Sequence, residues 1–123
     1  MSAVGICASI RIENFSAETW RPEDGYAAGC QVFDPETDTL VVEGARTPLP
    51  RALAPGEAIE VDVQVELPPE PGRYRVFASS MREGVCWHYA EGRPFLLIDA
   101  EVAGGRACVI RSARTTLSAL RLR

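Results

Sequence analysis

A chain of 123 residues, 46% hydrophobic and 24% charged, has the size and composition of one globular domain with its own core. Its formal charge of −4, with arginines scattered among acidic residues, argues against nucleic-acid binding, because affinity for phosphates requires a cationic surface. No segment approaches the roughly 20 consecutive apolar residues of a membrane-spanning helix, and no secretion signal is recognisable. We therefore expect a cytoplasmic protein that does not insert into membranes.

Most of the chain is predicted to form short β-strands separated by turns. In residues 4–12 apolar and polar side chains alternate, which is the two-residue period of a strand with one buried face. Further strands are predicted at residues 26–33, 39–43, 59–67, 74–81, 85–90 and 95–102. Turn sequences recur at a spacing of about ten residues, an arrangement typical of two packed antiparallel sheets.

The clearest strand is residues 59–67, where every odd position is apolar and every even position is polar. The turn Pro55–Gly56 precedes it, and the sequence PPEPG (68–72) ends it. The segment 44–57 contains too many prolines to be a central strand. The fold class predicted from these features is all-β, an immunoglobulin-like antiparallel β-sandwich of about seven to eight strands.

The last part of the chain differs in character, and we place a domain boundary there. Residues 1–103 are predicted to form the β-sandwich, and residues 104–123 a basic C-terminal tail or linker that follows a flexible Gly104–Gly105 break. Within it, residues 107–110 could add an edge strand. Ser112 as an N-cap and leucines at helical spacing predict a short helix at 112–123, through which the chain could dimerise by its segment 117–122.

The cysteines and the single histidine give no metal-binding pattern. Cys7, Cys30, Cys86 and Cys108 lack the paired CxxC spacing of a structural zinc site, and His88 is the one histidine. Reduced thiols are the favoured interpretation, and a disulfide between Cys30 and Cys86 is the alternative. We predict no metal site and no cofactor.

Catalytic motifs are also missing, so we expect a protein that is not an enzyme. The sequence contains no nucleophile elbow, phosphate-binding loop or HExxH motif. His88 is interpreted as an exposed strand residue. Cys86 and His88 would share one face of that strand, but no third group or oxyanion-stabilising device accompanies them.

One group of aromatic and polar residues has the composition of a sugar-binding site. Saccharide sites often combine an aromatic platform for the apolar face of the ring with planar polar side chains for the hydroxyls. The candidate ligand-binding residues are Trp20, Arg82, Glu83, Trp87, His88 and Tyr89. For Trp87, packing between the two sheets is the favoured interpretation. For Trp20, a structural plug and a binding platform remain equally open.

Four motifs in order carry a resemblance to a known family: NFSAETWRP (14–22), RTPLPRALAPGE (46–57), PPEPGRYRV (68–76) and REGVCWHYAEG (82–92). Together they resemble the immunoglobulin-like accessory domain appended to bacterial glycosyltransferases, methyltransferases and O-antigen export proteins of surface-polysaccharide assembly. The resemblance implies that Trp20 is a structural anchor and that residues 83–87 form a central hairpin. It further implies a non-catalytic role.

Two functions from different classes follow as hypotheses. The first is a module of polysaccharide biosynthesis or export that binds a bacterial polysaccharide or positions a fused or associated glycosyltransferase or ABC transporter. The second is a structural protein–protein module without sugar binding, which pairs through an exposed edge strand or forms a homodimer.

Overall fold

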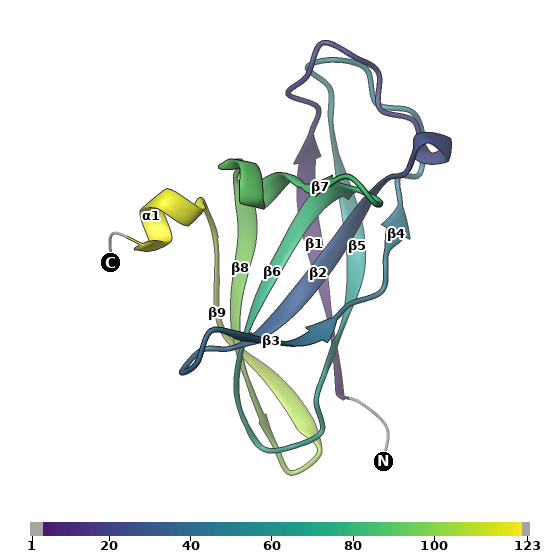
Figure 1. The fold of residues 1–123 in the computed structure, drawn as a ribbon. Helices are drawn as coiled ribbons and strands as arrows, with labels where there is room; N and C mark the ends of the chain where they lie inside the picture. Colours follow the sequence, from purple (N-terminus) through teal and green to yellow (C-terminus); the bar gives the residue numbers. More distant parts are fainter. Residues whose placement is uncertain (1–3, 122–123) are drawn as a thin grey trace.

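Two antiparallel sheets packed face to face make up the fold in the computed structural model, which describes residues 4–121 (Figure 1). Strands β1 (Val4–Glu13) and β5 (Ala58–Leu67) form the smaller sheet. The larger sheet consists of β2 (Tyr26–Asp34), β3 (Thr39–Glu43), β4 (Thr47–Pro48), β6 (Gly72–Arg82), β7 (Cys86–Trp87), β8 (Phe95–Ala103) and β9 (Arg106–Thr115). Its order is β3-β2-β6-β8-β9, with β4 paired to β2 and β7 paired to β6. The predicted antiparallel β-sandwich is confirmed.

Over the described residues, helical structure is limited to the 3₁₀ turns η1 (Pro22–Asp24) and η2 (His88–Glu91) and the helix α1 (Leu117–Arg121). Helix α1 has five residues, and the prediction of a short C-terminal helix is confirmed. Among residues 4–121, no helix is long and apolar enough to cross a membrane.

The smaller sheet follows directly from the alternation in its sequence. Strands β1 and β5 pair antiparallel along their whole length, from Val4 opposite Leu67 to Glu13 opposite Ala58. On β5, Val61 and Val63 are buried, whereas the polar residues between and around them are exposed. Each strand therefore turns one face to the larger sheet and the other to water, as its two-residue period predicts.

The larger sheet is covered on both faces. Between the sheets lies the main core, whose fully buried side chains include Ile12, Val32, Leu53, Val65, Leu67, Val76, Ile98 and Val102. We call the side turned away from β1 and β5 the outer face. It carries a second apolar cluster, formed by Phe77, Phe95 and Leu97 with Phe33, Tyr89, Leu117 and Leu120 packed against them.

The prediction of a strand at residues 85–90 is wrong for most of these residues. Only Cys86 and Trp87 pair with β6, and the chain then turns into η2. Hydrogen bonds from Gly92 N to Tyr89 O and from Arg93 N to His88 O close this turn. The alternation of apolar residues in this segment is typical of a strand. The tertiary packing of its aromatic rings overrides that local preference and favours the 3₁₀ turn.

The boundary predicted after residue 103 is also corrected. Strand β9 pairs with β8 from Phe95 opposite Thr115 to Ala103 opposite Arg106, so residues 106–115 belong to the sandwich rather than to a tail. Gly104 and Gly105 have positive φ angles of 59° and 75° and form the tight hairpin turn instead of a flexible break. The helix begins at Leu117 and not at 112, and the final part of the predicted dimerisation segment lies outside the described residues.

All four cysteines are free. Cys30 is buried in the core between the sheets, Cys86 is half-buried near η2, and Cys7 and Cys108 are exposed on edge-facing positions of β1 and β9. The alternative of a Cys30–Cys86 disulfide is therefore not realised.

Candidate functional site

The six predicted ligand-binding residues lie in two different places. Trp20 and His88 pack together inside the upper end of the sandwich, and the Arg82 guanidinium lies 4.9 Å above the ring of their neighbour Tyr26. Trp87, Tyr89 and Glu83 belong to the outer face of the larger sheet. The ring centroids of Trp87 and Tyr89 lie 5.8 Å apart. Glu83 forms an ion pair with Arg46.

Trp20 is a structural plug at the end of the sandwich. Its side chain is 2% exposed, and its ring stacks on those of Tyr26 at 5.0 Å and His88 at 4.8 Å, which themselves lie 6.4 Å apart. The edge of the cluster is closed by Phe15, whose ring centroid lies 5.2 Å from that of Trp20. Because almost none of its surface is exposed, Trp20 offers no platform to a ligand.

The loop that carries Trp20 is held in place by a buried asparagine for which no role was predicted. The Asn14 side chain is fully buried, and its amide donates to the carbonyl oxygens of Glu18 at 2.7 Å and Leu53 at 2.9 Å. Its Oδ1 accepts from the backbone N–H and the hydroxyl of Ser16 at 2.9 and 2.8 Å. An Asn followed two positions later by Ser, directly after a strand, is the sequence signal for such a turn.

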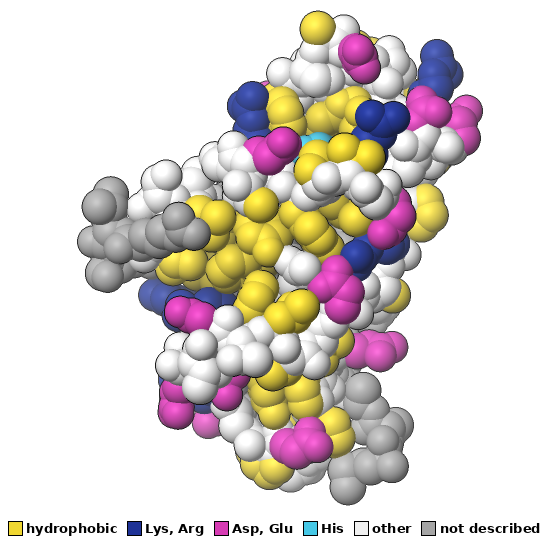
Figure 2. All heavy atoms as spheres, viewed as in Figure 1, with side chains coloured by type: hydrophobic (Ala, Val, Ile, Leu, Met, Phe, Trp, Pro, Cys, Tyr) yellow, Lys and Arg dark blue, Asp and Glu magenta, His cyan; other side chains and the backbone are white. Residues whose placement is uncertain are grey.

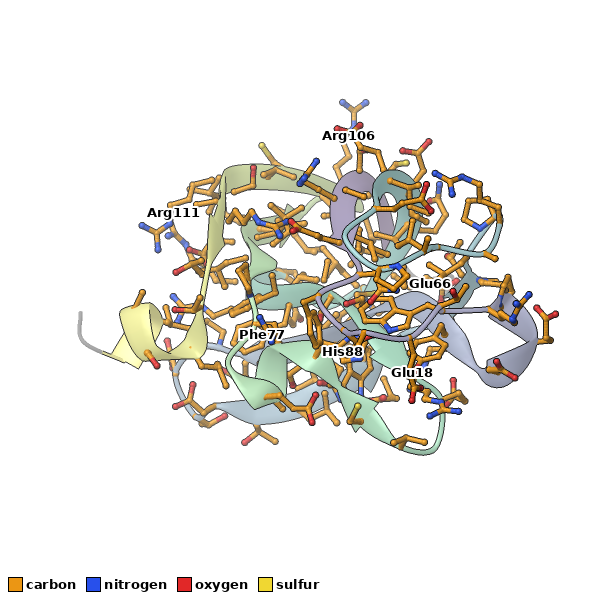
Figure 3. The ribbon with its side chains drawn as sticks, turned by 90° about the horizontal axis from the view of Figure 1, so that it is seen from above. Glu18, Glu66, Phe77, His88, Arg106 and Arg111 are labelled. Carbon is orange, nitrogen blue, oxygen red and sulfur yellow. The ribbon has the colours of Figure 1, made fainter. Side chains whose placement is uncertain are left out.

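His88 is buried, which corrects the prediction of an exposed strand residue. Its side chain is 4% exposed, and in the view from above it lies inside the molecule next to the loop that carries Glu18 (Figure 3). The ring stacks on Trp20, and its Nδ1 lies 2.7 Å from Ser80 Oγ. Burial lowers the pKa of His88; Glu91 opposes this shift and Arg93 reinforces it. The neutral imidazole is therefore favoured in the folded protein.

This burial predicts a pH dependence of stability. Since the pKa of His88 is lower in the folded state, the unfolded chain binds a proton more readily, and the stabilisation present above the ordinary value of 6.5 is lost as the pH falls below it. We expect the urea midpoint to be lower at about pH 5.5 than at about pH 7.5. His88→Gln should remove most of this difference, because the chain has one histidine. The same loss in both proteins would contradict the assignment.

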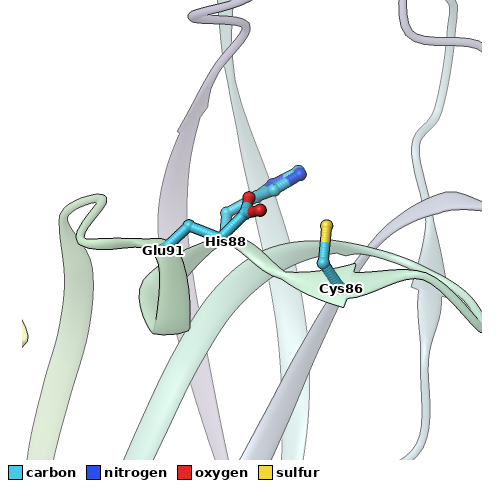
Figure 4. A group of neighbouring side chains, drawn as sticks. All are labelled: Cys86, His88 and Glu91. Carbon is cyan, nitrogen blue, oxygen red and sulfur yellow. The ribbon is translucent and has the colours of Figure 1, made fainter.

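Three potential ligand atoms meet beside this histidine. Donor atoms of Cys86, His88 and Glu91 all lie within 4.8 Å of one another, and their side chains project to the same side of the β7–η2 segment (Figure 4). Burial and the neighbouring Glu91 carboxylate raise the pKa of the Cys86 thiol, which disfavours a thiolate nucleophile. The sequence analysis missed this group because a strand would carry Glu91 away from Cys86 and His88, whereas the turn η2 brings it back.

Trp87 lies on the outer face, which corrects the prediction that it packs between the sheets. The ring is half-buried over Gly29 of β2, where an added Cβ would stand 2.9 Å from the ring carbon Cη2. The Arg46 guanidinium lies 4.8 Å from the ring centroid. Arg46 is held there by ion pairs with Glu43 at 2.7 Å and Glu83 at 3.0 Å.

Tyr89 extends this aromatic surface across the sheet. Its hydroxyl donates to the side-chain oxygen of Gln31. Its ring contacts Phe77 and Phe95 at centroid distances of 5.1 and 5.5 Å, in addition to Trp87. In the space-filling view, apolar side chains gather over the middle of this face, with charged groups around them (Figure 2).

A hollow of about 370 Å³ continues the same face towards the C-terminal helix. Its lining consists of Phe33, Asp38, Arg75, Phe77, Leu117 and Leu120. The lining therefore combines apolar and aromatic side chains with one acid and one base. Arg75 is oriented by Asp99, which its Nε contacts at 3.1 Å.

Comparisons of the chain with protein-family models, with curated proteins and with solved structures found no match. A β-sandwich alone does not determine a function, because one fold serves many activities.

Proposed function

We propose that this domain is a non-catalytic glycan-recognition module that binds saccharides on the outer face of the larger sheet. The observation that carries this proposal is the pair of half-buried aromatic rings Trp87 and Tyr89. Tyr89 packs on the buried Phe77, which also lines the hollow beside α1. Aromatic rings stack on the apolar faces of sugar rings, and planar amide, guanidinium and carboxylate groups bond their hydroxyls. Gln31 and Arg46 supply such groups beside the rings.

The charged groups of this face favour recognition over hydrolysis. Burial opposes ionisation of Glu43, but hydrogen bonds from Gln31 and Arg46 outweigh it and lower the pKa of the carboxyl. A carboxyl that stays ionised accepts hydrogen bonds from hydroxyls, and it is poorly suited to act as the general acid that glycoside hydrolysis requires. The neighbouring carboxylate, Glu83, is likewise paired with Arg46.

The wider role that we propose lies in the assembly or export of a bacterial surface polysaccharide of O-antigen type. Support comes from the resemblance carried by the four ordered motifs. The aromatic rings and the adjacent hollow on the outer face are consistent with it. A module of this kind would hold a polysaccharide next to a fused or associated glycosyltransferase or ABC transporter.

The proposal predicts that Trp87→Ala weakens saccharide binding. Loss of one aromatic contact worth roughly 1 kcal/mol should lower the affinity for a bacterial polysaccharide fragment by about fivefold. Glycan arrays would identify the fragment, and NMR titration would give its dissociation constant and the residues that shift. Phe15→Leu is the control, since Phe15 is a partly exposed aromatic residue at the upper end, away from this face. Equal weakening in both variants, or no response to any polysaccharide, would contradict the proposal.

A protein partner is the second candidate, and a specific feature of β9 favours it. This strand is at the end of the larger sheet, and its residues Val109 and Ile110 are 44% and 45% exposed. An exposed edge strand with apolar side chains can pair with a strand of another chain. Sedimentation that depends on protein concentration, together with the absence of saccharide binding, would favour this second function.

A further inference from the structure

We propose that Cys86, His88 and Glu91 form a binding site for a zinc-type transition-metal ion at the junction of β7 and η2. This inference goes beyond glycan recognition and does not rest on it, because none of the three side chains belongs to the aromatic surface of the outer face.

The spacing of the donor atoms fits a metal ion of this size. Zinc binds sulfur at about 2.3 Å and imidazole nitrogen at about 2.0–2.1 Å, so its tetrahedral ligand atoms stand roughly 3.3–3.8 Å apart. The three donor atoms already lie within 4.8 Å of one another. His88 and Glu91 are the first and last residues of η2, and Cys86 opens β7, so one short segment supplies the whole set. The half-buried Cys86 and the exposed Glu91 can close the remaining distance by side-chain rotation.

The histidine of this group is fixed in advance. Its ring is stacked on Trp20 and meets the edge of Phe15 at 5.1 Å, so it cannot swing away. One ring nitrogen, Nδ1, lies 2.7 Å from Ser80 Oγ, so a metal bound by the other nitrogen, Nε2, would leave this contact intact. Histidines that bind metals characteristically donate their second ring N–H to a neighbouring polar group. Burial also favours the neutral ring, which is the form that binds metals.

The donor types select the kind of metal. A thiolate, an imidazole and a carboxylate suit zinc and its spectroscopic substitute cobalt, whereas magnesium and calcium prefer sites made of oxygen atoms alone. Three protein ligands leave a fourth position open for water or a ligand. The Cys86 thiol must lose its proton on binding, so metal uptake should release a proton.

Cobalt titration tests the site directly. The protein would carry Cys7→Ser and Cys108→Ser, which remove the two exposed thiols that could bind metal elsewhere. We expect one equivalent of Co²⁺ to produce thiolate–cobalt charge-transfer absorption and the visible bands of a tetrahedral ion, and Zn²⁺ to displace it. Zinc should also raise the thermal midpoint, since it binds the folded state.

Three variants separate this site from chance binding. Cys86→Ser should abolish the charge-transfer band, and Glu91→Gln should weaken metal binding. Ser80→Ala should weaken it by about 10- to 100-fold, as the loss of a group that orients a ligand does. Glu83→Gln is the matched control, because Glu83 is a nearby exposed carboxylate that pairs with Arg46 instead. Unfolding curves recorded without metal check that each variant is folded.

The proposal is overturned if no charge-transfer band develops at stoichiometric cobalt. A band that persists in Cys86→Ser would overturn it as well, and so would equal affinities in Glu91→Gln and Glu83→Gln.

Discussion

Trp20→Ala is expected to lower the free energy of unfolding by about 3–5 kcal/mol, the range found when large aromatic side chains are removed from protein cores. Trp20 is 2% exposed, and its ring packs against those of Tyr26, His88 and Phe15. Alanine would leave a cavity there and would also remove the hydrogen bond that Nε1 donates to Ser16 Oγ at 3.0 Å. The backbone of residue 20 would still pair with Leu53, so the strands on either side need not separate.

Urea unfolding monitored by circular dichroism measures this loss. The chain offers a matched control, since its second tryptophan, Trp87, lies half-buried on the outer face. Trp87→Ala should cost clearly less stability, because its ring is only half-buried whereas that of Trp20 is 2% exposed. Similar losses in the two variants would show that Trp20 is not the principal aromatic anchor.

Asn14→Ala is expected to cost about 2–4 kcal/mol, because it removes four hydrogen bonds that are each worth roughly 1 kcal/mol. The Asn14 side chain is fully buried, so water cannot readily replace these bonds. The amide links the loop after β1 to the chain around Leu53, and this link positions Trp20.

Chemical denaturation of Asn14→Ala and Glu18→Ala side by side tests this role. Glu18 is exposed and contributes its backbone carbonyl, which alanine also has, so Glu18→Ala should leave the midpoint nearly unchanged. A midpoint for Asn14→Ala as high as that of Glu18→Ala would be inconsistent with the proposed role of the buried amide.

Strands with one solvent-exposed face could be predicted from the sequence. The orientation of strands that are covered on both faces was harder to predict. In β5 burial alternates at every step from Val61 to Leu67, and the sequence alternates with it. In β2 four consecutive residues, Ala27–Cys30, are buried, so no alternation marks which side faces the core. The outer apolar face was missed for this reason.

Strand β9 is almost fully exposed, and this explains why residues 104–123 were predicted to form a tail. Nearly all of β9 is exposed, so hydrophobic periodicity indicated at most a short edge strand at 107–110. The full length of β9, Arg106–Thr115, follows from its pairing with β8 through the Gly104–Gly105 turn. The same limit applies to local turns. The residues from Cys86 to Glu91 carry a strand-like sequence, and only their tertiary contacts produce η2.

The candidate ligand-binding residues are of types that suit saccharide binding, but the sequence could not predict which way their side chains point. Trp87 and His88 are neighbours in the chain, yet one lies on the outer face and the other is buried at the upper end. A one-residue difference sends side chains to opposite sides, so proximity in sequence did not place them in one site.

The seat of Trp87 on Gly29 links two positions that are far apart in the chain. A methyl group at position 29 would meet both the indole and the Arg46 side chain, at 2.9 and 3.2 Å. The shape of the proposed binding face therefore depends on position 29 being a glycine, which has no side chain. Substitutions at positions 29 and 87 should not be additive. During evolution, larger residues at position 29 should be tolerated better in chains that carry a smaller side chain at position 87.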